Sequence, residues 1–171
     1  RIVEATDDEI TAVLQDVYSG KIDDNLVGER VQEVKGTGAR CAVSITPAST
    51  KKLAPLATEA GADLVFVQST VTTARHISKS KRGLIFSELL ELIDIPVIVG
   101  NCVSYNVAYE LMETGIQGIL IGVGPGAACT TREVTGVGVP QVTATMEVSA
   151  ARNEFLKQTG KYVPVITDGG I

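Results

Sequence analysis

The sequence predicts an α/β fold built on a parallel sheet, because strand-like apolar runs alternate with helical patterns along most of the chain. Five runs rich in valine and isoleucine carry the prediction, at 41–45, 64–68, 96–100, 118–123 and 163–167. They do not alternate cleanly with polar residues, which is typical of strands that are buried on both faces. Strict alternation with helices also implies right-handed crossovers, and therefore parallel neighbours.

Helical periodicity fills the intervals between these runs. Helices are predicted at 49–62, 82–94, 104–115 and 141–160, and most of these patterns stop at or next to a glycine, a common helix end. Two further helices are expected before the first strand, at about 7–18 and about 25–35, with a polar link at 19–25 between them.

Two architectures fit five alternating units, an open doubly wound sheet and a (β/α)8 TIM barrel. A complete barrel typically needs about 250 residues, so 171 residues supply about five of its central βα units. The chain begins without methionine and stops at a Gly-Gly turn directly after a strand-like run. These ends favour the barrel, and we expect residues 1–171 to form a single, incomplete barrel domain.

Composition excludes several classes of partner. The net charge is −5, basic runs are short and aromatic residues make up only 4%, which argues against nucleic acid as the main partner. No apolar run reaches the ~18 residues that a membrane helix needs. The three cysteines are far apart, odd in number and without zinc-type spacing, which favours a reducing cytoplasm.

Polar residues and glycines gather where the predicted strands end. In either architecture the carboxyl ends of the strands are where ligands bind. The segments that follow the five strands are Ser44 with Thr46-Pro47, Gln68-Ser69-Thr70, Gly100-Asn101, a glycine-rich loop, and Asp168-Gly169-Gly170. Asn101 and Asp168 also fit as helix caps, and His76 and the basic run 78–82 fit as solvated surface.

The glycine-rich loop holds the third cysteine. "GVGPGAACTTREVTGVGVPQ" (122–141) contains five glycines, and Gly122, Gly124 and Gly126 free its backbone to approach a ligand or ion closely. A thiol among backbone amides and near a helix start can be stabilised as the thiolate. Cys129 is therefore the candidate nucleophile, whereas Cys41 in a strand and Cys102 at a helix start are expected to be packing residues.

This loop resembles the catalytic loop of the IMP dehydrogenase and GMP reductase family. That loop typically reads Gly-x-Gly-Pro-Gly-Ser-x-Cys-Thr-Thr-Arg and continues as Thr-Gly-Val-Gly-x-Pro-Gln. The resemblance also covers the "GN" at 100–101 and the closing "DGGI", and it runs from about 38 to 171, being weakest in 1–37. It implies a TIM barrel whose third to seventh strands are the five runs here.

The resemblance implies a covalent oxidoreductase of purine nucleotides. Cys129 is implied as the nucleophile that attacks the hypoxanthine ring, and Thr131 as the threonine linked to water activation. Asp168 is implied to bind the ribose hydroxyls, with Gly169, Gly170 and the Ala127 position near the phosphate. A potassium ion is implied on backbone carbonyls, namely those of Gly124, Gly126 and Cys129.

The cofactor implied by the resemblance is NAD. Its binding residues are implied to be Gln68, Ser69, Thr70, Asn101, Gly122 and Gly124. The family usually has an acid where this chain has Gln68, so NADP is also possible and weaker discrimination between the two is expected. The family has serine where this chain has Ala127, which removes one phosphate contact. Both departures indicate a divergent branch without CBS domains.

The expected function is that of an IMP dehydrogenase, converting IMP, NAD and water to XMP and NADH in guanine nucleotide synthesis. Two alternatives stay open, a GMP reductase that uses NADPH and a catalytically idle barrel that binds nucleotides. An unrelated phosphate-binding barrel enzyme is disfavoured by the cysteine loop. The resemblance also implies a cytoplasmic homotetramer.

Overall fold

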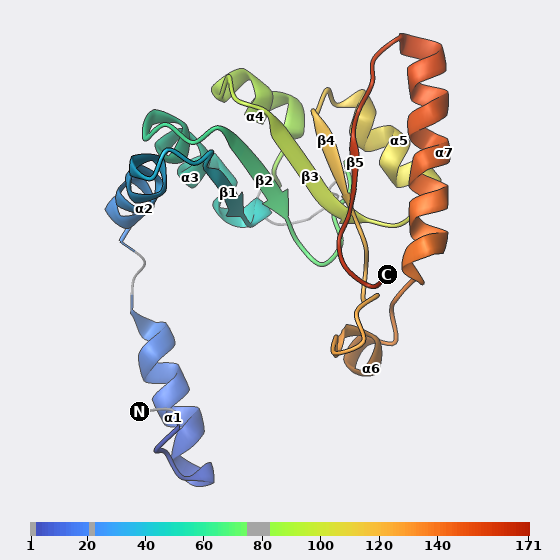
Figure 1. Cartoon of the computed structure of the whole chain (residues 1–171). Helices are drawn as coiled ribbons and strands as arrows, with labels where there is room; N and C mark the ends of the chain where they lie inside the picture. Colours follow the sequence, from blue (N-terminus) through green and yellow to red (C-terminus); the bar gives the residue numbers. More distant parts are fainter. Residues whose placement is uncertain (1–2, 21–22, 75–82) are drawn as a thin grey trace.

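The computed structural model describes residues 3–20, 23–74 and 83–171. Its centre is a five-stranded sheet (Figure 1) in the order β1-β2-β3-β4-β5, and every neighbouring pair is parallel. The strands are β1 (Ala42–Ile45), β2 (Leu64–Gln68), β3 (Val97–Cys102), β4 (Gly118–Ile121) and β5 (Val165–Thr167). No described helix is both long and apolar enough to cross a membrane.

The strand order decides between the two predicted architectures. A doubly wound sheet reverses its strand order at a switch point, whereas here each strand pairs with the next one along the chain. Sequential parallel strands with helical crossovers are consecutive βα units of a barrel wall. The prediction of about five barrel units is confirmed, and within the described residues β1 and β5 each pair with one strand only.

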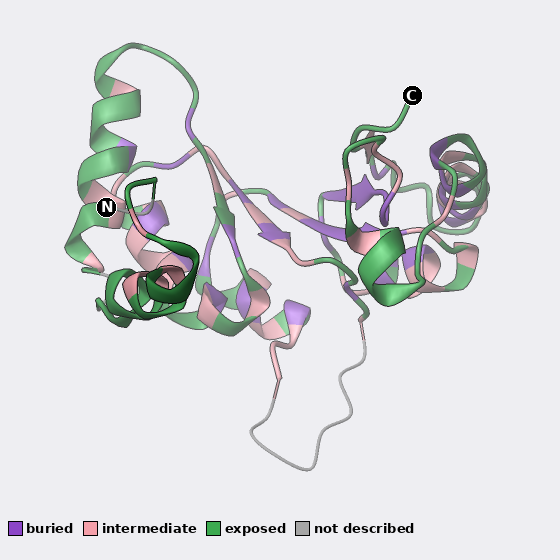
Figure 2. Ribbon diagram, turned by 90° about the horizontal axis from the view of Figure 1, so that it is seen from below, coloured by how far each residue is buried: buried purple, intermediate pink, exposed green. Residues whose placement is uncertain are grey.

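Seven helices are described, and three of them pack against the two strands that they connect. They are α1 (Asp7–Ser19), α2 (Asn25–Gly36), α3 (Pro47–Glu59), α4 (Phe86–Leu92), α5 (Tyr105–Glu113), α6 (Thr131–Thr135) and α7 (Gln141–Thr159). The packed helices are α3 on β1 and β2, α5 on β3 and β4, and α7 on β4 and β5. The short α6 and the loop around it stay exposed, while buried residues line the strands (Figure 2).

The main core lies between the sheet and these helices. Val65, Val67, Val97 and Val99 are fully buried, whereas Phe66 and Ile98 on the other face of the sheet are half-buried. The predicted burial on both faces therefore holds for β4 but not for β2. Alanines at the sheet-facing positions of the helices, such as Ala144 on α7, let the helices approach the strands closely. The core therefore fixes the strand ends from which the polar loops project.

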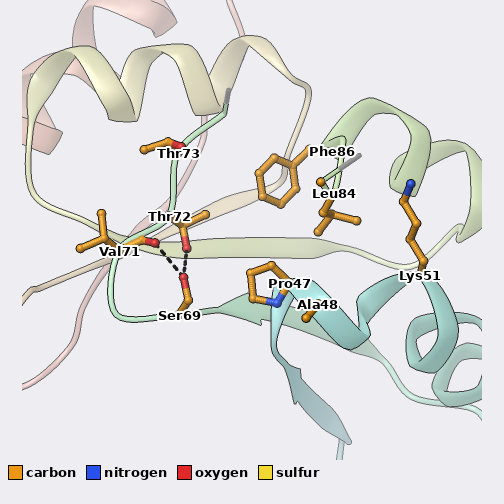
Figure 3. A pocket seen from close by; sticks show the side chains of 10 residues that line it. Pro47, Ala48, Lys51, Ser69, Val71, Thr72, Thr73, Leu84 and Phe86 are labelled. Carbon is orange, nitrogen blue, oxygen red and sulfur yellow. Dashed lines mark hydrogen bonds between the residues drawn. The ribbon is translucent and has the colours of Figure 1, made fainter. Parts of the chain in front are cut away.

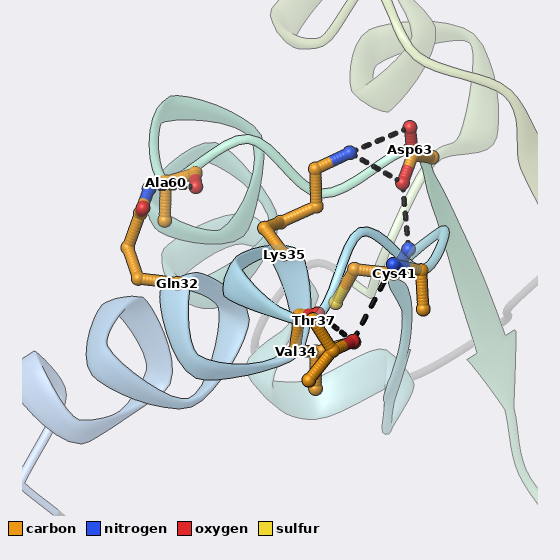
Figure 4. Close-up of polar contacts among 8 residues, drawn as sticks. Gln32, Val34, Lys35, Thr37, Cys41, Ala60 and Asp63 are labelled. Atoms are coloured by element: carbon orange, nitrogen blue, oxygen red, sulfur yellow. Dashed lines mark hydrogen bonds and ion pairs between the residues drawn. The ribbon is translucent and has the colours of Figure 1, made fainter.

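An ion pair attaches α2 to the amino ends of β1 and β2 (Figure 4). Lys35 Nζ donates to both carboxylate oxygens of Asp63, at 3.0 and 2.9 Å, and Asp63 Oδ2 accepts from the Cys41 amide at 2.6 Å. The Lys35 ammonium and this amide hold the pKa of Asp63 below its usual range. Helix α1, in contrast, has no buried residue and stands apart from the sheet in Figure 1.

The predicted boundaries are wrong in three places. The helix predicted at 82–94 is the shorter α4, because Ile85 and Ile93 on either side of it have extended backbones. Cys102 was predicted to open a helix, but it ends β3, because Asn101 N donates to Ser69 O at 3.0 Å and so extends the ladder past the apolar run. Helix α6 was predicted as part of the loop. His76 and the basic run 78–82 lie outside the described residues.

Candidate active site

Three polar segments meet at the carboxyl ends of β3, β4 and β5. Asn101 is the penultimate residue of β3, the glycine-rich loop follows β4, and Asp168 follows β5. Asn101 Nδ2 donates to Asp168 Oδ2 at 2.9 Å. Asn101 is buried and its Oδ1 atom has no partner among the described residues, whereas Asp168 is exposed. Asn101 therefore orients the Asp168 carboxylate, which faces solvent. The Asn101 Oδ1 atom behind it can still accept a hydrogen bond.

Close backbone approach brings the glycine-rich loop against the turn after β5. A Cβ atom added at Gly170 would lie 2.5 Å from Pro125 Cβ, and one added at Gly122 would lie 3.1 Å from the Asp168 carbonyl oxygen. Gly122 and Gly170 also have positive φ angles, of 137° and 74°. Glycine is thus required on both sides of this contact, which places residues 122–126 beside residues 168–170.

Cys129 lies on the same loop, half-buried, directly before α6. Its thiol donates to Thr131 Oγ1 over 3.3 Å. Hydrogen bonds from the Thr131 side chain and backbone, together with the nearby Arg132 charge, hold the pKa of the Cys129 thiol below its ordinary value. Burial instead raises the pKa of Cys102 to about 12. Of these two thiols, Cys129 is the one equipped to act as a nucleophile.

Replacing Thr131 with valine is expected to raise the pKa of Cys129, because the hydroxyl that stabilises the thiolate is lost. Alkylation by iodoacetamide should then need a higher pH and be slower at pH 7 than in the parent protein. The measurement is the pH dependence of the alkylation rate at Cys129, followed by mass spectrometry. A Thr130→Val variant is the matched control, and equal profiles for all three proteins would contradict the assignment.

One of the three loop carbonyls that are predicted to hold a cation, that of Gly126, faces positive charge in the structure. Gly126 O accepts from the Cys129 amide at 3.2 Å and from Arg132 Nη2 at 3.2 Å. Backbone carbonyl oxygens suit a hard monovalent cation. A cation bound to Gly126 O, however, would share that oxygen with the Arg132 guanidinium. Within residues 3–20, 23–74 and 83–171, no group of three or more His, Cys, Asp or Glu side chains could hold a metal.

The segment predicted to bind the cofactor begins at the end of β2. Gln68 accepts a hydrogen bond from Ser44 Oγ at 3.3 Å, and Thr70 is exposed. Ser69 Oγ donates to Val71 O at 2.8 Å and lies 2.8 Å from Thr72 Oγ1. A pocket of about 480 Å³ opens beside this segment, between α3 and α4 (Figure 3). The lining includes Pro47, Lys51, Ser69, Thr72, Leu84 and Phe86.

Hydrogen bonds join this pocket to the Asn101–Asp168 pair. Ser69 N donates to Gly100 O at 3.0 Å, Thr72 N donates to Asn101 O at 2.9 Å, and Thr72 Oγ1 donates to Gly100 O at 2.6 Å. The Gly100–Asn101 peptide itself is cis. The pocket and the carboxylate are thus linked at the strand ends by a network of buried hydrogen bonds.

Two buried polar residues of this region were not predicted. Thr72 supplies the bond to Gly100 O, and Gln141, only 2% exposed, donates from Nε2 to Ile121 O at 2.8 Å. Gln141 Oε1 has no partner in the part of the chain that the structure describes. The available signal for Gln141 was its position after Pro140, at the first residue of a long helix that packs on the sheet.

Comparison with known proteins agrees with this geometry. The profile of the IMP dehydrogenase / GMP reductase domain matches residues 26–171. The chain belongs to the IMP dehydrogenase and GMP reductase family. The family resemblance drawn from the glycine-rich loop is thereby confirmed, and it reaches further towards the amino terminus than the expected limit of about residue 38.

Individual members of the family match over most of the chain. An uncharacterized oxidoreductase of Mycolicibacterium smegmatis is 34% identical over 161 residues, which is 93% of this chain and 43% of that protein. Inosine-5'-monophosphate dehydrogenase of Cryptosporidium parvum is 40% identical over 118 residues, 69% of this chain and 27% of that protein. The chain thus spans less than half the length of these relatives.

A solved structure of the same family also matches. The crystal structure of an IMP dehydrogenase/GMP reductase-like protein from Corynebacterium glutamicum superposes with a TM-score of 0.82 at 34% identity. The match covers 95% of this chain and 42% of that one. This likeness supports the assignment of the five strands to a TIM-barrel wall.

Proposed function

We propose that the protein containing this chain is a purine-nucleotide oxidoreductase that forms a covalent bond between Cys129 and its substrate. The observation that carries the proposal is the Cys129 thiol, which has a lowered pKa and lies on the glycine-rich loop packed against the turn after Asp168. Family membership supplies the class of chemistry. The reaction that we favour is the oxidation of IMP to XMP, with water and NAD.

The thiolate has the first role in this reaction. Cys129 adds to carbon 2 of the hypoxanthine ring, and the hydride from that carbon is transferred away, leaving a thioimidate on the sulfur. Bound NAD would accept this hydride. Water then adds to the same carbon and the sulfur departs, giving XMP and the free thiol. Thr131, 3.3 Å from the sulfur, is placed to help in deprotonating that water.

Asp168 and its neighbours are proposed to hold the substrate. The carboxylate, oriented by Asn101 at 2.9 Å, would accept hydrogen bonds from the ribose hydroxyls. Gly169 and Gly170 leave backbone amides open to the phosphate, close to the Ala127 position. Carbonyls of Gly124, Gly126 and Cys129 would hold the potassium ion. The cofactor would lie along Ser69 and Thr70, with Gln68, Gly122 and Gly124 near its nicotinamide half.

GMP reductase is the second candidate function. It is favoured by Gln68, a neutral side chain at the end of β2 that accepts a hydrogen bond from Ser44 Oγ. Glutamine in place of the family's acid removes one negative charge from this end of the site, and with it a long-range repulsion of a cofactor that carries an additional phosphate. In this reaction Cys129 would add to carbon 2 of GMP and ammonia would leave. Bound NADPH would supply a hydride to the same carbon, and the sulfur would depart to give IMP and the free thiol.

The test is to trap the covalent adduct in the full-length protein. The protein is mixed with IMP and NAD, or separately with GMP and NADPH, quenched with acid and measured by intact-mass spectrometry. We expect a nucleotide adduct that peptide mapping places on Cys129, and the productive pair of substrates identifies the direction. If neither pair gives an adduct, or if it maps to another residue, the proposed function is wrong.

A further inference from the structure

We infer that Lys51 makes the pocket between α3 and α4 selective for a dinucleotide that carries a 2'-phosphate on its adenosine ribose. The inference deepens the proposed function, because it rests on a dinucleotide occupying this pocket. It concerns the choice of cofactor: under it NADP takes the place of NAD as hydride acceptor in the oxidation of IMP, and NADPH is the donor in the reduction of GMP.

Lys51 is the charged side chain of the pocket. Among the described lining residues no other is ionisable, since the remainder are apolar residues, serine, threonines and a glycine. Lys51 lies on α3, and its ammonium points towards α4 (Figure 3), where Nζ is 3.6 Å from Glu88 Oε2. Both side chains are partly exposed, so the ammonium can exchange this long contact for a bound anion.

The position of Lys51 selects which phosphate it meets. Ser69 and Thr72 form the end of the pocket that is hydrogen-bonded to Gly100 and Asn101. Lys51 lies at the other end, beyond Pro47 and Leu84 (Figure 3). A nicotinamide placed near Asn101 and the cysteine loop therefore directs the adenosine half of the molecule towards Lys51. The adenosine half carries one phosphate of its own, on the 2'-oxygen of the ribose, and this is the phosphate that Lys51 would meet.

The other walls of the pocket suit an adenosine. Pro47 and Leu84 present apolar surface between Lys51 and the hydroxyls (Figure 3), and Phe86, only 3% exposed, forms the floor behind them. Apolar walls suit a purine ring, while one cation and no carboxylate among the described lining residues favour an added phosphate. Gln68, at the end of β2, adds no negative charge either.

The experiment compares two ligands of equal phosphate number by calorimetry on the full-length protein. Adenosine 2',5'-bisphosphate carries the 2'-phosphate, and adenosine 5'-diphosphate does not. We expect the first to bind more tightly, and Lys51→Met to weaken it at least about tenfold, as expected for a lost hydrogen bond to a charged group. The affinity for the 5'-diphosphate should change less than about threefold, the scale of an exposed charge.

Two further variants sharpen the result. Glu88→Gln removes the competing carboxylate and should tighten the 2',5'-bisphosphate. Lys52→Met is the matched control, because the neighbouring Lys52 pairs with Asp24 and does not line the pocket. If Lys51→Met lowered the affinity for both ligands equally, the inference would be overturned, because Lys51 would then contact the phosphates on the 5' side and not the 2'-phosphate. Equal affinity of the parent protein for both ligands would also overturn it.

The outcome is independent of the adduct experiment. An adduct on Cys129 without preference for the 2'-phosphate leaves the proposed function standing and removes the role of Lys51. Selective binding of the 2',5'-bisphosphate without an adduct supports the pocket and removes the covalent mechanism.

Discussion

Replacing Cys129 with alanine is expected to abolish turnover of the full-length protein, lowering kcat by at least about 10⁴-fold, as for other enzymes that lose a covalent nucleophile. The physical reason is that the thiolate opens a two-step route at the purine ring, and alanine leaves only direct displacement. Binding of the nucleotide should persist, because Asp168 and the turn after it are untouched. The measurement combines steady-state kinetics with calorimetric titration of the nucleotide.

Cys102→Ala is the matched control for this variant. Cys102 is fully buried and its pKa is raised to about 12, so its sulfur packs in the core. This change should leave kcat close to the parent value and cost about 1 kcal/mol of stability, the typical size of a core substitution. A Cys129→Ala protein that turns over at a rate near that of the parent would remove Cys129 from the mechanism.

Gly100→Ala is expected to destabilise the protein by about 3 kcal/mol, at the upper end for overpacked sites. A Cβ atom at Gly100 would lie 2.4 Å from the Leu120 carbonyl oxygen and 2.6 Å from Leu120 Cβ. The carbonyl belongs to the β3–β4 ladder and cannot rotate aside, so the two strands must separate. The measurement is the thermal unfolding midpoint of the full-length protein, which should fall by several degrees.

The control is Gly36→Ala, at the end of α2. A Cβ atom there meets nothing within 4 Å, and alanine is favoured over glycine in a helix by roughly 0.5–1 kcal/mol. This variant should unfold at the parent temperature or slightly above it. If Gly100→Ala unfolded at the same temperature as Gly36→Ala, the close contact between β3 and β4 at Gly100 would be refuted.

The fold could be predicted from the sequence because its signals are local. Two-sided apolar runs such as 64–68 and 96–100 mark strands wherever they occur, and the family motif marks the cysteine loop. The parallel order of the strands follows from their alternation with helices. No comparable local signal exists for the end of β3, where polar Asn101 continues the ladder through the bond from its backbone amide to Ser69 O, and its side chain bonds to Asp168.

The contacts of the candidate site depend on pairings that the sequence does not display. Thr72 is identical in type to its neighbour Thr73, yet Thr72 is buried and donates a hydrogen bond to Gly100 O, whereas Thr73 is exposed. Lys51 and Lys52 are adjacent and alike in sequence, but one faces the pocket and the other pairs with Asp24. The helix phase of α3 and the register of β2 against β3 decide these differences.

The sequential strand order also has a consequence for the folding of the chain. Each pairing joins neighbours along the chain, such as Ala42 with Leu64 and Ile98 with Gly118, so the wall can grow one unit at a time as the chain leaves the ribosome. The pairing of Ile119 with Val165 spans the longest stretch of chain and comes last. Until β5 docks, Asn101 has no Asp168 to orient, and the Cys129 thiol emerges before the carboxylate that is proposed to anchor the substrate.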